Sequence, residues 1–220
     1  MTPTARRTAW IAAAVIALVI IADQWLKIWV KTSFYLGEEL EIFPWFKLLF
    51  VQNPGMAFGW SLGNKLVLTI FRFVATAFGF WYLFRLLRSP KVKAGLCVCI
   101  ALILAGAIGN LIDCTFYGLV FNNPMPPAVA NAFPSAGGYA PVFHGQVVDM
   151  LYFPLFSFTW PGWMPFVGGE YFEFFHPIFN IADAAVSVGV IALILFYSGD
   201  LSLIDEPQAA GSDNDVAANQ

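Results

Sequence analysis

Four apolar runs dominate the chain, and each is long enough to cross a lipid bilayer as a helix. They extend over about Thr8–Val30, Leu66–Leu87, Ala94–Leu111 and Ile178–Tyr197. A membrane-spanning helix needs about 20 apolar residues. Charged residues make up only 11% of the chain and the mean hydropathy is +0.71, whereas a soluble domain is about 25% charged. The sequence therefore predicts an all-α membrane protein with four transmembrane helices.

The first apolar run also fits a second interpretation. Arg6 and Arg7 precede it, as basic residues precede the apolar part of a secretory signal peptide. However, no Ala-x-Ala cleavage site follows, and the run continues through Trp25 and Trp29. We therefore expect the first helix to be retained.

The distribution of basic residues predicts the orientation of the spans. Arg6 and Arg7 precede the first span, and four more cations link the second to the third, Arg85, Arg88, Lys91 and Lys93. Because loops rich in Lys and Arg stay in the cytoplasm, both termini are predicted to be cytoplasmic. Residues 1–198 are then one four-helix membrane domain, and residues 199–220 are a disordered acidic cytoplasmic tail.

The two segments predicted to lie outside, residues 31–65 and 112–177, are unusually aromatic. Trp and Phe side chains alternate there with Gly and Pro, a composition typical of the membrane interface. Alternation of polar and apolar residues around residues 40–52 predicts short strands. The expected fold thus includes a small periplasmic β-rich or interfacial element.

Four aspartates are predicted to lie near the same membrane face: Asp23, Asp113, Asp149 and Asp183. Ionisable groups at the edge of a bilayer are costly, and they often mark functional sites. Two carboxylates that meet can share a proton and activate water.

Polar residues accompany these acids at helical spacing. Asp23 and Lys27 are spaced i,i+4, and their pairing could serve only to end the helix at the interface. Asn110 and Asp113 are spaced i,i+3, as are Asn180 and Asp183. A polar helix end explains the first of these pairs as well as a site does. Asp183 lies about one turn inside its span and favours a functional interpretation.

Two further features leave alternatives open. Asn53 and Gly55 lie in an Asn-Pro-Gly segment that could be an ordinary turn, or could present Asn53 to a peptide backbone. Arg72 lies inside the second span, where it could extend to lipid phosphates or pair with one of the acids.

Several function classes fit poorly. The three cysteines and two histidines show no zinc-ligand spacing, so we expect no metal or other cofactor. The sequence has no cluster of basic residues of the kind that binds nucleic acids. A small proton-coupled transporter or ion-pathway subunit is the main alternative, but it would distribute acids across the membrane depth.

The motifs together resemble one family, lipoprotein signal peptidase, also called signal peptidase II. They occur in the family's order between residues 23 and 183: Asp23-Gln-x-x-Lys27, Asn53-x-Gly55-x-Ala57-Phe58, Gly109-Asn110-x-x-Asp113, Val148-Asp149 and Phe179-Asn180-x-Ala182-Asp183. Each is modest alone, and the ordered set is specific.

The resemblance implies an aspartic endopeptidase of the bacterial inner membrane, with its active site near the periplasmic face. Such enzymes remove signal peptides from diacylglyceryl-modified prolipoproteins, so prolipoproteins and membrane lipids are the implied partners. The implied catalytic pair is Asp149 and Asp183. Residues implied to bind substrate or support the site are Asn53, Gly55, Asn110, Asp113, Asn180, Asp23 and Lys27.

The chain departs from the family pattern in two places. Cys114 stands where the family usually has Arg, and Arg72 is a candidate substitute. About thirty-five residues separate Asp113 from Asp149, where the family usually has about ten. This insertion resembles versions from Bacteroidetes-like bacteria.

Overall fold

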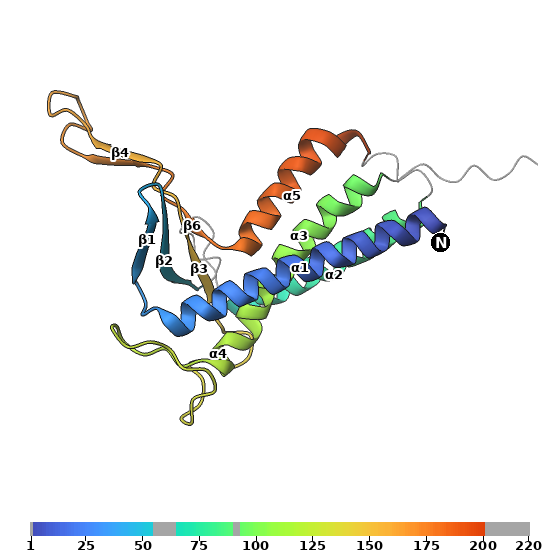
Figure 1. Cartoon of the computed structure of the whole chain (residues 1–220), viewed down its shortest axis with the longest axis horizontal. Coiled ribbons are helices and arrows are strands. Elements are labelled where there is room, and N and C mark those ends of the chain that lie inside the picture. Colours follow the sequence, from blue (N-terminus) through green and yellow to red (C-terminus); the bar gives the residue numbers. More distant parts are fainter. Residues whose placement is uncertain (1, 55–64, 90–92, 201–220) are drawn as a thin grey trace, which may run out of the picture.

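The computed structural model describes residues 2–54, 65–89 and 93–200. Within these ranges four helices are long and apolar enough to span a membrane, as predicted. They are α1 (Pro3–Ser33), α2 (Lys65–Arg88), α3 (Ala94–Ile112) and α5 (Ile181–Tyr197). Figure 1 shows them grouped together, with the strands at the end opposite the N-terminus. The acidic tail predicted for residues 199–220 lies outside the described residues beyond Asp200.

The helix α3 lies at the centre of the helical group. Its apolar stretch is 56% buried, whereas those of α1, α2 and α5 are 11%, 17% and 17% buried. The outer helices therefore turn most of their apolar side chains outwards, as helices surrounded by lipid do. Inward-facing leucines of α2 and α3, such as Leu86 and Leu104, form the core between them.

Close packing of α3 against α5 depends on Gly106. A Cβ at this position would lie 2.2 Å from the carbonyl oxygen of Ala182 and 2.6 Å from Cγ2 of Val186. Small residues at such positions let membrane helices approach closely. The approach of α5 matters because Asp183 lies in its first turn.

The third span is longer than the sequence indicates. A π-helical turn, Asp113–Tyr117, and the short helix α4 (Gly118–Val120) continue α3. The third span was predicted to end at about Leu111, and that prediction was wrong, because the helix continues through Asp113 to Val120. The π-helical turn keeps Asp113 buried against its neighbours.

The β element is larger than predicted. The strands expected around residues 40–52 are present as β1 (Glu39–Phe43) and β2 (Phe46–Asn53). They form an antiparallel sheet, in the order β1-β2-β3-β6, with two strands that the sequence did not indicate. These are β3 (Val147–Tyr152) and β6 (Ile178–Phe179). Ile178 was predicted to begin the fourth span, but Ile178 and Phe179 pair with β3, so the helix begins at Ile181.

A second, two-stranded sheet projects from the first. It consists of β4 (Phe156–Thr159) and β5 (Tyr171–Phe174), paired antiparallel. Figure 1 shows this hairpin extending away from the four helices. The segment between α4 and β3 forms only isolated bridges, Tyr35↔Val129 and Phe121↔Ala132.

Lys31 joins α1 to the sheet and to this inserted segment. Its side chain is fully buried, and its ammonium group lies 5.3–5.6 Å from the ring centroids of Phe50, Phe121 and Tyr139. An ammonium group this close to aromatic faces is stabilised by the ring quadrupoles. These contacts attach the insertion to the end of α1.

Candidate active site

The site is built around one fully buried ammonium group. Lys27 Nζ lies 2.9 Å from Asp23 Oδ2, 2.8 Å from Asp113 Oδ2 and 2.9 Å from Asn110 Oδ1. All three acceptors come from α1 and the third span, and the exposed fractions of Lys27, Asp23 and Asp113 are 0%, 1% and 0%. A buried charge needs this degree of pairing. The i,i+4 pair of the sequence is therefore part of a larger network and does not simply end a helix.

Gln24 completes the contacts between α1 and the third span. Its Nε2 donates to Asp113 Oδ1 at 2.9 Å and to the carbonyl oxygen of Gly109 at 3.1 Å. Tyr117 donates from its hydroxyl to Gln24 Oε1 at 3.1 Å. Asp113 is also reached from the sheet, since Val148 N donates to its Oδ2 at 3.3 Å.

Asp23 also holds the start of α5. Its Oδ1 accepts a hydrogen bond from Ala182 N at 2.9 Å. The first backbone N–H groups of a helix have no partner within the helix. One carboxylate on α1 thus positions the turn of α5 that carries Asp183.

Asn180 and Asp183 form a capping box at that turn. The side-chain oxygen of Asn180 accepts from Asp183 N at 2.9 Å, and Asp183 Oδ2 accepts from Asn180 N at 3.4 Å. A negative charge in the first turn interacts favourably with the helix dipole. The local sequence Asn-x-x-Asp therefore both begins the helix and fixes the direction of the Asp183 side chain.

Asp149 is brought to the same place by the sheet. It lies in β3, opposite Val51 of β2. On its other side β3 pairs with β6, and β6 leads directly into Asn180. Asn180 Nδ2 donates to Asp149 Oδ1 at 2.6 Å and to Asn110 Oδ1 at 3.1 Å. Asn110 Nδ2 in turn donates to Asp183 Oδ1 at 2.7 Å. Two asparagines therefore join the two carboxyl groups.

Burial changes the acidity of Asp149. Its side chain is 4% exposed. Burial and, second, the negative charge of Asp183 raise the pKa of Asp149 to about 7, although hydrogen bonds from Asn180 and Asn53 act in the opposite direction. Both causes disfavour the charged carboxylate. Near neutral pH, both the protonated and the ionised form of Asp149 are therefore populated.

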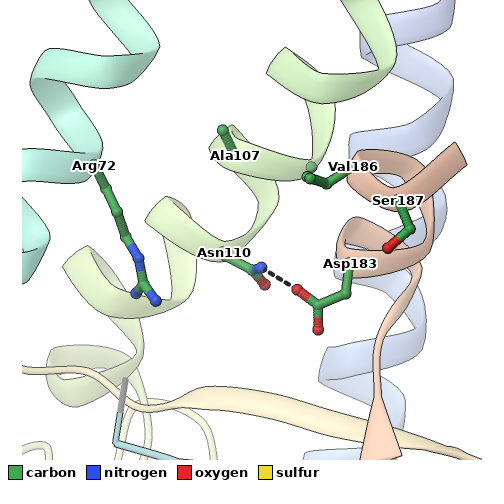
Figure 2. Close-up of a pocket in the computed structure, with 7 residues that line it drawn as sticks. Arg72, Ala107, Asn110, Asp183, Val186 and Ser187 are labelled. Carbon is green, nitrogen blue, oxygen red and sulfur yellow. Dashed lines mark hydrogen bonds between the residues drawn. The ribbon is translucent and has the colours of Figure 1, made fainter. Parts of the chain in front are cut away.

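A cleft of about 340 Å³ opens beside the carboxyl group of Asp183. Its walls combine polar side chains with small and apolar ones from α2, α3 and α5, namely Arg72, Gly106, Ala107, Asn110, Asp183, Val186 and Ser187. Figure 2 shows Arg72 on one side of α3, and Asp183 and Ser187 on the other. Asp183 and Asn110 are partly exposed, so a molecule in the cleft can reach them.

Among the described residues, Arg72 contacts Cys114 and not one of the acids. Its Nη1 lies 2.9 Å from Cys114 Sγ, and its side chain is partly buried at the cleft. Cys114 stands where the resemblance leads one to expect Arg. Within the described ranges no ion pair joins Arg72 to an acid, and its guanidinium group lines the cleft that Asp183 lines.

The structure gathers almost all of the residues predicted to form a site. Gly55 lies outside the described residues. Asn53 ends β2, beside Val147 of β3, and hydrogen-bonds to Asp149. Sequence reasoning missed the roles of Gln24 and Tyr117 in the network. Gln24 belongs to the Asp23-Gln-x-x-Lys27 motif but was given no role there, and Tyr117 carried no signal. In the described part of the chain, no three His, Cys, Asp or Glu side chains are arranged to hold a metal ion.

Replacing Lys27 tests how far the site depends on its ammonium group. The variant Lys27→Met leaves Asp23 and Asp113 buried without their counter-charge, so we expect unfolding to cost about 3–5 kcal/mol less. Chemical unfolding in detergent measures this loss. Lys47→Met is the matched control, because it removes an exposed ion pair with Glu39, and it should leave stability unchanged. Equal stability of the two variants would contradict the central role of Lys27.

Comparison with known proteins places this chain among related sequences. The family described as Signal peptidase (SPase) II matches residues 15–198. A protein named lipoprotein signal peptidase from Porphyromonas gingivalis is 48% identical over 194 residues, which are 88% of this chain and 85% of that protein. Another of the same name, from Amoebophilus asiaticus, is 36% identical over 192 residues, 84% of this chain and 77% of that protein.

The fold is shared with a solved structure. A bacterial membrane enzyme determined by the in meso method at 2.3 Å resolution has a TM-score of 0.55 and is 24% identical, covering 90% of this chain and 94% of that one. This likeness supports the architecture of membrane helices with a small antiparallel sheet. The family match covers nearly all of the described chain, and the predicted resemblance to this family is confirmed. The chain belongs to the signal peptidase II family.

Proposed function

We propose that this peptidase removes signal peptides from lipoprotein precursors, using Asp149 and Asp183 as its catalytic pair. The observation that carries the proposal is the convergence of both carboxyl groups on Asn180 and Asn110, beside a cleft between membrane helices. The relatives named lipoprotein signal peptidase support the substrate class. The transporter alternative finds no support in the family match or in these relatives.

The two carboxyl groups lie in different surroundings, which suggests different roles. Asp149 is buried in the sheet and its pKa is raised to about 7, so it is the member that carries the proton. Asp183 is partly exposed at the N-terminus of α5, where the helix dipole favours a negative charge. Asp183 is therefore the general base and Asp149 the general acid.

The reaction needs water and these two groups. Asp183 accepts a proton from water as the water oxygen attacks the scissile carbonyl carbon, and Asp149 donates its proton to the carbonyl oxygen. The tetrahedral diol then collapses. Its C–N bond breaks, the leaving nitrogen takes the proton from Asp183, and Asp149 recovers a proton from the diol hydroxyl. The products are a carboxylic acid and an amine, and both side chains return to their starting states.

The remaining site residues support this pair. Asn53, Asn110 and Asn180 hold the carboxyl groups by hydrogen bonds. Asp23, Lys27 and Asp113 fix the helices from which these groups project. Gly55 follows Asn53 and is proposed to border the bound peptide. We assign the apolar part of the cleft to the diacylglyceryl chains of the substrate.

Removing either carboxylate tests the assignment. Asp149→Asn and Asp183→Asn keep the shape of each side chain but remove proton exchange, so we expect cleavage to fall at least about a hundredfold. The measurement is release of the signal peptide from a diacylglyceryl-modified precursor by the purified full chain. Glu173→Gln is the control, because Glu173 lies outside the cleft. If Asp149→Asn cleaves the precursor at the normal rate while Asp183→Asn does not, the pair is wrongly assigned.

The raised pKa of Asp149 predicts the pH dependence. Its ordinary value of 3.8 rises to about 7 in the folded protein, so the folded protein holds this proton more tightly than the unfolded chain does. As pH rises between these values, Asp149 therefore stabilises the fold less, and above about 7 the general acid is lost. We therefore expect kcat/KM, measured as a function of pH, to decline on the alkaline side.

Asn53 offers a way to move that alkaline limb. Its hydrogen bond lowers the pKa of Asp149, so Asn53→Ala should shift the limb of the kcat/KM profile to higher pH. The profile of kcat/KM is the right measurement, because it reports the ionisation of groups in the free enzyme. A limb that stays in place, or moves to lower pH, would contradict the role of Asp149 as the acid.

We propose that the protein lies in the bacterial inner membrane with both termini in the cytoplasm and the site near the periplasmic face. The cations at residues 6–7 and 85–93 support this orientation. Fusions of alkaline phosphatase after Leu40 and after Gly138 should be active, because this reporter folds only in the periplasm. Inactive fusions at both positions would show that the predicted orientation is wrong.

A further inference from the structure

The hairpin of β4 and β5 has two chemically different faces. Phe156 lies opposite Phe174, and Phe158 lies opposite Phe172. The rings of the first pair stack with centroids 4.8 Å apart, and those of the second pair are 5.1 Å apart. Because side chains alternate along a strand, the other face carries Ser157, Thr159, Tyr171 and Glu173. The hairpin is therefore an amphipathic ribbon, which we call the aromatic arm (residues 156–174).

The aromatic face is only partly covered within the described structure. Trp160 packs against Phe158 and Phe172, but Phe156 and Phe174 are 53% and 45% exposed. All four residues of β4 are exposed, and Figure 1 shows the arm lying clear of the helices. The tip carries Trp163 and Phe166, which are 80% and 100% exposed. A single two-stranded hairpin is at best marginally stable in water. Its aromatic face therefore calls for an apolar partner.

Contacts at the base of the arm turn the polar face towards the sheet. Tyr152 of β3 donates from its hydroxyl to Glu173, and His176 Nδ1 lies 3.0 Å from the same carboxylate. Both interactions involve the face opposite the phenylalanines. The aromatic face is consequently left pointing away from the protein's own polar groups.

The bilayer is the partner that fits the position and chemistry of the arm. The base of the arm leads within a few residues to α5, whose outward side chains Ile191, Ile194 and Leu195 are over half exposed. Stacked rings continue from the β1–β2 turn to this base, through Trp45, Phe153 and Phe179. Residues 154–177 contain no Lys or Arg, so the arm has no cationic group with which to bind lipid phosphates. Trp, Tyr and Phe are side chains suited to the boundary between headgroups and acyl chains.

We propose that the aromatic arm lies in this boundary of the same bilayer that the helices span, with Trp163 and Phe166 at its inserted tip. The arm then adds a second contact between the enzyme and the membrane surface, to one side of the sheet that carries Asp149. This inference does not depend on the peptidase chemistry.

Fluorescent labels on the tip test the proposal. A single cysteine replaces either Phe166 or Gly162. A Cβ at Gly162 would meet no other atom within 4 Å. Each cysteine is labelled with bimane in the full chain. The native cysteines are buried, so they label little. The protein is placed in phosphatidylcholine nanodiscs with doxyl groups near the headgroups, and iodide is the aqueous quencher. Leu195→Cys serves as the lipid-exposed reference and Thr2→Cys as the aqueous one.

We expect the labels at residues 162 and 166 to be quenched by doxyl lipid as at residue 195, with loss of the iodide quenching seen at residue 2. Phe156→Ser with Phe174→Ser should reduce the lipid quenching at residue 162, whereas Ser157→Ala with Thr159→Ala on the polar face should not. Labels quenched by iodide and not by lipid would overturn the proposal. So would labels that lose iodide quenching only when a lipidated peptide is added, or only at high protein concentration, since the partner would then be substrate or a second copy.

Discussion

The site depends on one ammonium group buried among carboxylates. Lys27 is fully buried and contacts Asp23, Asp113 and Asn110. Each of these acceptors also bonds a second element, since Asp23 holds the first turn of α5, Asp113 accepts from β3, and Asn110 donates to Asp183. Because removing one partner of a buried ion pair leaves an uncompensated charge, the helices and the sheet cannot separate without breaking this network. The cation therefore fixes the geometry of the carboxyl groups without touching Asp149.

The proposed catalytic pair gains its asymmetry from its two supports. A strand buried between neighbours carries Asp149, and a helix N-terminus carries Asp183. The first environment disfavours charge and the second favours it. Asn180 belongs to both, since its amide nitrogen bonds Asp149 and its oxygen caps the helix of Asp183. A short connection between β6 and α5 is thus enough to bring a proton donor and a proton acceptor together.

Much of this could be predicted from the sequence because membrane helices carry strong local signals. Apolar length marked the four spans, and the spacing of Asn180 with Asp183 marked the polar start of α5. The sheet was harder, since β3 and β6 are short and their pairing joins residues about thirty positions apart. The helical position of Asp113 was missed because a π-helical turn leaves no pattern in the residues that form it. The contact of Arg72 with Cys114 depends on how α2 packs against α3, which no local spacing encodes.

Infrared spectroscopy of the protonated carboxyl group is the sharpest test of a catalytic pair whose one proton is held by Asp149. With aspartate labelled by ¹³C, we expect a carbonyl stretch of a protonated side chain that disappears as pH rises through about 7. This band should be absent from Asp149→Asn. In Asp183→Asn it should be present but disappear at lower pH, because the negative charge of Asp183 contributes to the raised pKa of Asp149. A band that persists unchanged in Asp149→Asn, or an Asp149 that is already ionised well below neutral pH, would contradict the assignment of Asp149 as the proton carrier.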